Sequence, residues 1–339
     1  MEIAIWSGFI LIIIILLALD LGVFHKKSGE ISAKDSMLWT AIWIVISLAF
    51  NVGIYFAYES HLFGIGSTLG HPMNGREAAL NFFVGYLLEK SLSIDNLFVI
   101  AMIFAYFKVP LKYQHEILFW GILGTLISRG VLIIFGAALI NNFSWVSYIF
   151  GILLIFSAVK MITARQDNVD PYKNPVIKFL KRFYPITKGF HEGKFFVIEN
   201  GVKAITPLFV VLVVIETTDI MFAVDSIPAI FAVTTDAFIV FTSNVFAILG
   251  LRSLYFVLAA FMKRFHYLKM SLVFLLAFIG VKMLLVHFFK FPILVSLAII
   301  AGILGVGVIA SIYAGDKDSA QLVSPIDAVK DIEQDQNKQ

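Results

Sequence analysis

The chain is a series of long apolar runs separated by short polar connections. The runs lie roughly at 3–24, 37–58, 79–107, 115–140, 145–164, 206–234, 237–262, 270–288 and 291–314. A helix needs about 20 apolar residues to cross the hydrocarbon of a bilayer, and each run comes close to that length. The pattern therefore predicts an all-α polytopic membrane protein with about nine transmembrane helices.

Composition excludes a soluble fold. Hydrophobic residues make up 60% of the chain and charged residues 14%, whereas a soluble domain has about 45–50% apolar and about 25% charged residues. The outer surface must therefore face lipid. The chain contains no cysteine, which excludes disulfides and thiolate metal sites. The first run has neither a basic segment before it nor a small-residue cleavage site after it, so we expect a transmembrane helix rather than a signal peptide.

The distribution of Lys and Arg predicts the orientation. Basic residues gather after the first, third, fifth and seventh runs and are scarce in the other loops. Cytoplasmic loops carry the excess of Lys and Arg, so we expect the N-terminus outside and the C-terminus in the cytoplasm. We divide the chain into a transmembrane transporter domain at 1–315 and a disordered cytoplasmic tail at 316–339, because the tail is polar and charged.

One connection is long and basic. Residues 165–205 form a predicted cytoplasmic loop in which Lys and Arg outnumber the acids. Within it, Asn200-Gly201 lies between two short apolar stretches, which predicts a β-hairpin because this dipeptide suits a type I′ turn. The basic charge is compatible with binding anionic lipid head groups, although it also serves simply as the topology signal of a cytoplasmic loop.

Spans three to five and spans six to eight resemble each other. Residues 93–96 match 223–226, residues 119–124 match 245–250, and residues 157–161 match 279–283. Each unit holds three helices, an odd number, so the second unit must enter the membrane inverted. Inverted three-helix repeats recur in secondary transporters, which hold their substrate near mid-membrane at the repeat interface.

Acidic residues inside the apolar runs are the most informative feature. They are Asp20, Glu89, Asp95, Glu216, Asp219 and Asp225. Each costs about 2.5–3.5 kcal/mol at the centre of a membrane helix, so something must compensate them. One interpretation is a purely structural network with the bases Lys90, Arg129, Lys160, Arg252 and Lys282. A bound cation is favoured instead, because five of the acids cluster on two matched helices.

The predicted metal ligands are all oxygen donors. They are Glu89, Asp95, Asn96, Glu216, Asp219 and Asp225, with Asp20, Ser93, Ser226 and Asn244 as accessory candidates. Carboxylate, amide and hydroxyl oxygens suit Mg²⁺, Ca²⁺ and Mn²⁺, and ligand chemistry alone does not choose among these ions. Pro228 is expected to kink or unwind the turn that holds Asp225, which would direct its carboxylate and freed carbonyls toward the same ion.

Several motifs resemble one family of bacterial membrane proteins. The stretches 89–100, 216–244 and 248–256, the end of the first span at 20–27 and the hairpin at 194–207 are similar to the TerC/Alx family. The resemblance implies manganese export, a historical link to tellurium resistance, kinship with LysE-type exporters and location in the bacterial cytoplasmic (inner) membrane. It also implies that Glu89, Asp95, Glu216, Asp219 and Asp225 form the cation site.

The sequence therefore predicts a secondary transporter that exports Mn²⁺ from the cytoplasm, with proton exchange as the candidate driving reaction. No P-loop motif for ATP is present. We expect no enzymatic activity, no permanently bound cofactor and no nucleic-acid partner; the partners are the divalent metal ion and the lipid bilayer. Two alternatives are an intramembrane aspartyl protease, which would carry a GxGD motif, and a non-transporting membrane partner for metal delivery to secreted enzymes or for a tellurite or stress resistance complex.

Overall fold

The structure is a computed structural model of the whole chain. It describes residues 2–25, 33–66, 71–163, 175–187, 189–199, 201–261, 268–286, 288–289 and 291–314. The predicted tail at 316–339 and the first part of the basic loop lie outside the described residues.

Helices account for most of the described chain. They are α1 (Glu2–His25), α2 (Ala33–Glu59), α3 (Gly75–Tyr106), α4 (Leu111–Asn142), α5 (Val146–Thr163), α6 (Pro175–Phe183), α7 (Pro207–Phe231), α8 (Ala237–Ile248), α9 (Leu251–Phe261), α10 (Leu268–Leu284) and α11 (Ile293–Ala314). Each predicted span corresponds to one of these helices, except that the seventh is divided between α8 and α9. The all-α membrane fold predicted from the sequence is therefore confirmed.

Among the described residues, six helices are long and apolar enough to cross a membrane, and the bent pair of α8 and α9 makes a seventh if it is counted as one span. Helix α3, which carries Glu89, Lys90 and Asp95 along its middle, and the shorter α10 are not among them. The expected count of nine spans thus stays a prediction.

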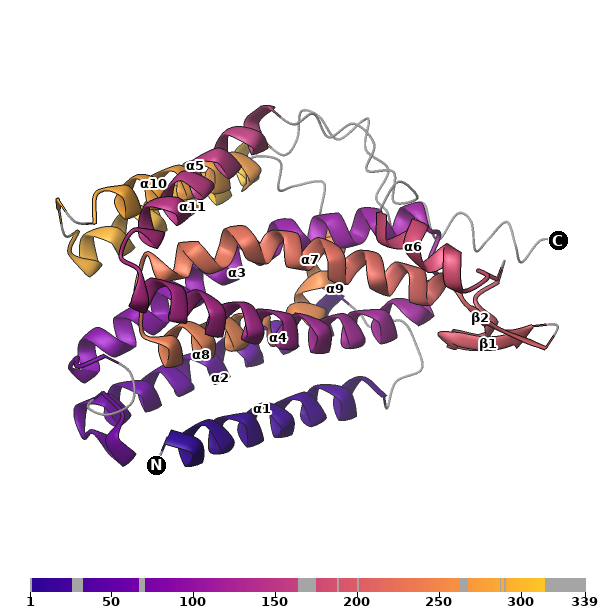
Figure 1. Cartoon of the computed structure of the whole chain (residues 1–339), viewed down its shortest axis with the longest axis horizontal. Coiled ribbons are helices and arrows are strands. Elements are labelled where there is room, and N and C mark those ends of the chain that lie inside the picture. The colour runs from indigo at the N-terminus through magenta and orange to yellow at the C-terminus, as the bar shows by residue number, and fades with distance from the viewer. Residues whose placement is uncertain are drawn as a thin grey trace.

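The helices lie side by side, with the short sheet at one end (Figure 1). Helices α5, α10 and α11 pack together on one side and α1 lies at the opposite edge, with α3, α4 and α7 between them. Helix α3 packs against α8, and α4 packs against α7. In the predicted repeats, α3 corresponds to α7 and α4 corresponds to the α8–α9 pair. The α3–α8 contact and the α7–α4 contact are therefore equivalent. The arrangement agrees with a repeat of this kind, although the inverted repeat itself stays a prediction.

Three apolar clusters form the interior. The first lies where α5, α7 and α10 meet and includes Leu154, Ile230 and Leu276. The second joins α1, α2, α3 and α8 and includes Phe9, Phe82 and Phe246. The third joins α3, α4, α7 and α9 and includes Leu97, Val211 and Tyr255. On the outside, large apolar side chains such as Ile134, Phe135 and Val306 are exposed, as a lipid-facing surface requires.

A β-hairpin is present at the position expected from the sequence. Strand β1 (Phe196–Glu199) pairs antiparallel with β2 (Val202–Ile205). Gly201 has a φ of 78°, a value that glycine adopts without steric cost. The short helix α6, which the sequence analysis did not predict, packs against α7 with Ile177 buried and Phe179 and Phe183 exposed.

The break between α8 and α9 is built from specific contacts. The two helices are bent by 44°, and Gly250 at the break has a φ of 80°. A β-carbon at this position would lie 2.6 Å from the Trp43 side chain of α2. The ammonium of Lys90 donates to the carbonyls of Ala247 at 3.1 Å and Leu249 at 3.4 Å, which satisfies acceptors left free at the end of α8.

The unwound segment expected at Asp225 is not found, because α7 continues as a helix through this residue to Phe231. Pro228 removes the hydrogen bond to the Val224 carbonyl, and a kink at this turn stays a prediction. Among the described residues, the broken span is the α8–α9 pair.

Substituting Gly250 with Ala should destabilise the protein. The positive φ and the overlap with Trp43 should together lower the free energy of unfolding by about 1–3 kcal/mol, measured by thermal unfolding in detergent. The control is Gly302→Ala on α11, where a β-carbon meets nothing within 4 Å; its midpoint should stay unchanged or rise slightly. An equal drop in both variants would contradict the role given to Gly250.

Candidate functional site

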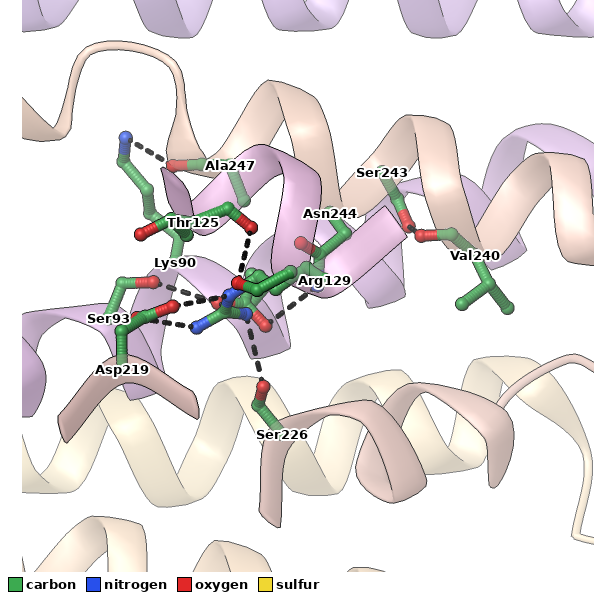
Figure 2. Close-up of polar contacts among 12 residues, drawn as sticks. Lys90, Ser93, Thr125, Arg129, Asp219, Ser226, Val240, Ser243, Asn244 and Ala247 are labelled. Atoms are coloured by element: carbon green, nitrogen blue, oxygen red, sulfur yellow. Dashed lines mark hydrogen bonds and ion pairs between the residues drawn. The ribbon is translucent and has the colours of Figure 1, made fainter. Parts of the chain in front are cut away.

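An arginine buried in the middle of the bundle joins acidic residues from two neighbouring helices. Arg129 lies on α4 and is 1% exposed. Its guanidinium forms a short ion pair with Glu89 of α3. It also donates to both carboxylate oxygens of Asp219 on α7, at 3.2 Å from Nη2 and 3.4 Å from Nε. Nη1 donates to the Ser226 Oγ at 3.1 Å. Figure 2 shows Asp219 and Ser226 directed toward Arg129.

The carboxylate of Glu89 is bonded on both oxygens. Its Oε1 accepts from Arg129 and, at 2.9 Å, from the Ser93 hydroxyl; its Oε2 accepts from the Asn244 Nδ2 of α8 at 3.1 Å. Because the amide nitrogen of Asn244 faces the carboxylate, its oxygen is directed elsewhere. This Oδ1 atom is buried and has no hydrogen-bond partner among the described residues. The network therefore contains one unused buried acceptor.

We call Glu89, Ser93, Arg129, Asp219, Ser226 and Asn244 the Arg129 network. It lies where the apolar clusters meet. On α4, Leu126 belongs to the second cluster and Ile133 to the first, with Arg129 between them. The residues of α7 likewise change from the third cluster to the first across Asp219. The network thus lies at the level where α4 and α7 both pass into the first apolar cluster.

The acids of α7 are staggered along the helix. At 1.5 Å per residue, Glu216 lies about 4.5 Å from Asp219 along the axis and Asp225 about 9 Å from it in the opposite direction. The Glu216 carboxylate lies so close to Gly124 of α4 that a β-carbon there would overlap it. Asp225 accepts a hydrogen bond of 2.6 Å from the Ser157 hydroxyl of α5.

Glu216 differs from the other acids of the helix. It forms no hydrogen bond or ion pair among the described residues, and its side chain is half-buried. Asp225 interacts electrostatically with Lys160 on α5 in addition to its bond with Ser157. Glu216 is therefore the acid of α7 whose charge is not balanced by a neighbouring donor in the described structure.

The remaining predicted residues lie apart from the Arg129 network. Asp20 of α1 is 4% exposed and its Oδ2 pairs with the Arg252 Nη2 of α9 at 3.0 Å. Asp95 is half-buried on α3, about 9 Å along the axis from Glu89. Asn96 beside it is 7% exposed.

In the part of the chain that the structure describes, no three His, Asp or Glu side chains are grouped closely enough to hold a metal ion. Two surface hollows, of about 870 and 470 Å³, lie at the β-hairpin and between α10 and α11, and none of the predicted acids lines either of them. The structural-network interpretation accounts for Glu89 and Asp219 through Arg129 and for Asp20 through Arg252. The metal-ligand role of the predicted residues stays a prediction.

Sequence reasoning missed two residues that shape the site. Ser157 bonds to Asp225, and Gly124 provides the space for Glu216. Both lie in stretches that match between the two predicted repeats, and this repetition was the available signal. Arg129 was named only as one of several bases, because spacing along the chain does not reveal that it lies between two acids from other helices.

Comparison with known proteins gives a consistent result. A family described as "Integral membrane protein TerC family" matches residues 74–319. An uncharacterized membrane protein of Myxococcus xanthus, STKORF319, is 45% identical over 307 residues, covering 91% of each chain. A protein of Escherichia coli strain K12, named as a membrane-bound redox modulator, Alx, is 43% identical over 300 residues, covering 88% of this chain and 91% of the relative. No solved structure matches the chain.

Neutralising Asp20 should test whether it is a metal ligand or the partner of Arg252. Breaking a buried ion pair by removing one member costs about 3–5 kcal/mol, so Asp20→Asn should lower the thermal unfolding midpoint in detergent. Its Mn²⁺ affinity, measured by calorimetric titration, should equal that of the wild type.

The double variant Asp20→Asn/Arg252→Gln should recover part of the lost stability, because no uncompensated charge stays buried. Loss of Mn²⁺ binding without loss of stability in Asp20→Asn would make Asp20 a ligand and contradict this assignment.

Proposed function

Because the chain belongs to the TerC family of integral membrane proteins, we propose that it is a secondary transporter that exports Mn²⁺ from the cytoplasm. One observation carries the proposal: charged groups from three helices, the carboxylates of α3 and α7 and the guanidinium of α4, meet in the buried Arg129 network at the centre of a lipid-facing bundle. Ionisable groups at membrane depth are costly and typically line the path of an ion or proton.

The staggered acids suit stepwise passage of a cation. Glu216, Asp219 and Asp225 follow one another along α7 over about 14 Å, roughly half the thickness of the hydrocarbon core. In the predicted orientation, Glu216 is nearest the cytoplasm. A cation leaving the cytoplasm meets Glu216 first, then the oxygens of Glu89 and Asp219, and then Asp225. Several weak sites in series allow an ion to enter and also to leave, as conduction requires.

The oxygen chemistry of these positions selects hard cations. Carboxylates of α3 and α7, the Ser226 hydroxyl and the unused Asn244 Oδ1 are ligands of the kind that Mn²⁺, Mg²⁺ and Ca²⁺ prefer. The resemblance of the motifs to TerC/Alx exporters supports Mn²⁺ among the three. No resident cofactor is needed for this reaction, and Mn²⁺ is the transported substrate.

Export requires a driving reaction. Moving a divalent cation out against an inside-negative potential costs about 4.6 kcal/mol per 100 mV, and the sequence has no ATP-binding P-loop. Exchange of one Mn²⁺ for two protons would carry no net charge across the membrane and would remove this cost. Carboxylates suit such an exchange because each binds either a metal ion or a proton.

A second function is supported by the names of relatives. A non-transporting membrane partner that affects metal delivery or the redox state of other proteins would fit relatives named as redox modulators. The chain contains no cysteine, so an effect on thiol redox state would arise through another protein. A partner of this kind would produce no Mn²⁺ flux when purified.

Neutralising the acids along the path should abolish export. In cells exposed to manganese, Glu216→Gln and Asp225→Asn should each raise cytosolic Mn²⁺ to the level of cells without the protein, because each removes a charged oxygen from the path. Cytosolic Mn²⁺ is measured with a fluorescent reporter, and protein amounts in the membrane are matched.

The control is Glu77→Gln, an exposed acid in the first turn of α3, which should export like the wild type. Wild-type protein purified into liposomes without partners should transport Mn²⁺. Its failure to do so would favour the non-transporting function.

Proton exchange predicts a defined pH change. In proteoliposomes loaded with Mn²⁺, the interior should become more acidic as Mn²⁺ leaves, because protons enter in exchange; an internal pH dye reports this change. An outward-directed Mn²⁺ flux should also accelerate when the outside is made more acidic. Flux that is indifferent to an imposed pH gradient would rule out this coupling but leave transport itself intact.

A further inference from the structure

We infer that Arg129 is a tethered cation that takes the place of the transported metal between Glu89 and Asp219, and that it must be displaced before a divalent cation binds there. The inference rests on the proposed transport function and assigns part of the transport cycle to a basic residue. A basic residue at this place would otherwise be expected to repel a metal ion.

The contacts of Arg129 are those that a metal ion would use. Its guanidinium faces the Oε1 of Glu89, both carboxylate oxygens of Asp219 and the hydroxyl oxygen of Ser226. Four oxygens from two helices thus already point at one positive charge. A hard divalent cation prefers these same atoms, so the guanidinium and the metal compete for them.

Asn244 provides an observation that is independent of the ion pairs. Its Oδ1 atom is buried, belongs to a residue that is 1% exposed, and accepts no hydrogen bond from the described residues. The same amide donates to Glu89 from its nitrogen. A buried acceptor without a donor is unfavourable. If the amide turns over so that its oxygen faces a cation bound beside Glu89, the oxygen gains a partner that the guanidinium does not provide.

Arginine competes with the metal ion whatever the pH, because its charge does not titrate. A guanidinium keeps its charge at every pH at which proteins are folded, so it leaves the carboxylates by moving and not by losing a proton. Its planar fork bonds to both oxygens of Asp219, which makes it a stronger competitor than a lysine ammonium.

A destination for the displaced guanidinium lies one helical turn away. Glu216 precedes Asp219 by three residues on α7 and has no bonded partner among the described residues. Its carboxylate lies against α4, the helix that carries Arg129. A metal ion at Glu216 and the guanidinium at Asp219 can therefore exchange places. Glu216 and Asp219 then each keep a cation as partner.

This exchange explains how the carrier returns without metal. A metal-free site with two bare carboxylates would be costly at membrane depth, and Arg129 removes one of these charges. Without the guanidinium, the carrier should still move when metal is bound but should return slowly when empty. Exchange of Mn²⁺ for Mn²⁺ needs only the loaded carrier, whereas net transport needs the empty one.

The test compares Arg129→Gln with the wild type in two assays. Mn²⁺ binding to purified protein is measured by calorimetric titration, and proteoliposomes report net Mn²⁺ efflux and exchange of radioactive Mn²⁺. Arg129→Gln should bind Mn²⁺ about tenfold or more tightly, because it lacks the competitor. It should keep exchange near the wild-type rate and lose about tenfold or more of net efflux. The control Arg76→Gln, at an exposed arginine on α3, should change none of these.

Arg129→Lys covers the case in which the glutamine variant does not fold. Lysine keeps the charge but cannot form the fork, so its Mn²⁺ affinity should be tighter than that of the wild type and its net efflux partly retained. Unchanged or weaker binding in a folded Arg129 variant, or equal loss of exchange and net efflux, overturns the inference. A wild type that binds Mn²⁺ without transporting it defeats the proposed function instead, and the affinity comparison still decides whether the guanidinium competes with the metal.

Discussion

The packing of the central helices depends on the ion pairs of Arg129. One guanidinium binds Glu89 of α3 and Asp219 of α7 from its place on α4, so these three helices cannot separate without exposing charges to hydrocarbon. Removing charges from water is costly, and the attraction between buried charges offsets that cost only with good geometry and further hydrogen bonds. Ser93, Ser226 and Asn244 provide those bonds.

The positions of the helices follow from the need to bring polar groups together among apolar surfaces. Gly124 lets α4 approach the Glu216 carboxylate, and Gly250 lets the α8–α9 break fit against Trp43. Lys90, adjacent to Glu89 on α3, holds the carbonyls at that break. The same segment of α3 therefore contributes both to the Arg129 network and to the broken helix, so a shift of α3 would affect both at once.

Much of the fold could be predicted from the sequence, and less of the site. The length and apolar character of each run located every long helix, and Asn200-Gly201 located the hairpin, because both signals are local. The expected unwinding near Pro228 is absent because α7 stays helical to Phe231, while the observed break lies at Gly250, which packs against Trp43 of another helix. The acids were found because charge in an apolar run is conspicuous, but their partners come from other helices, and spacing along the chain does not specify which base an acid meets.

The acids of the membrane region are compensated in different ways, and this difference has a consequence for the proposed transport. Asp20 and Glu89 have an arginine, Asp219 shares one, and Asp225 has a serine and a nearby lysine. Glu216 has none of these among the described residues. A cation is stabilised most by the acid that has the fewest other partners. An entering ion therefore binds at Glu216 without displacing an existing contact. In the proposed transport, each further step displaces an existing partner, and this would favour a doubly charged ion, because the guanidinium that it must displace carries a single diffuse charge.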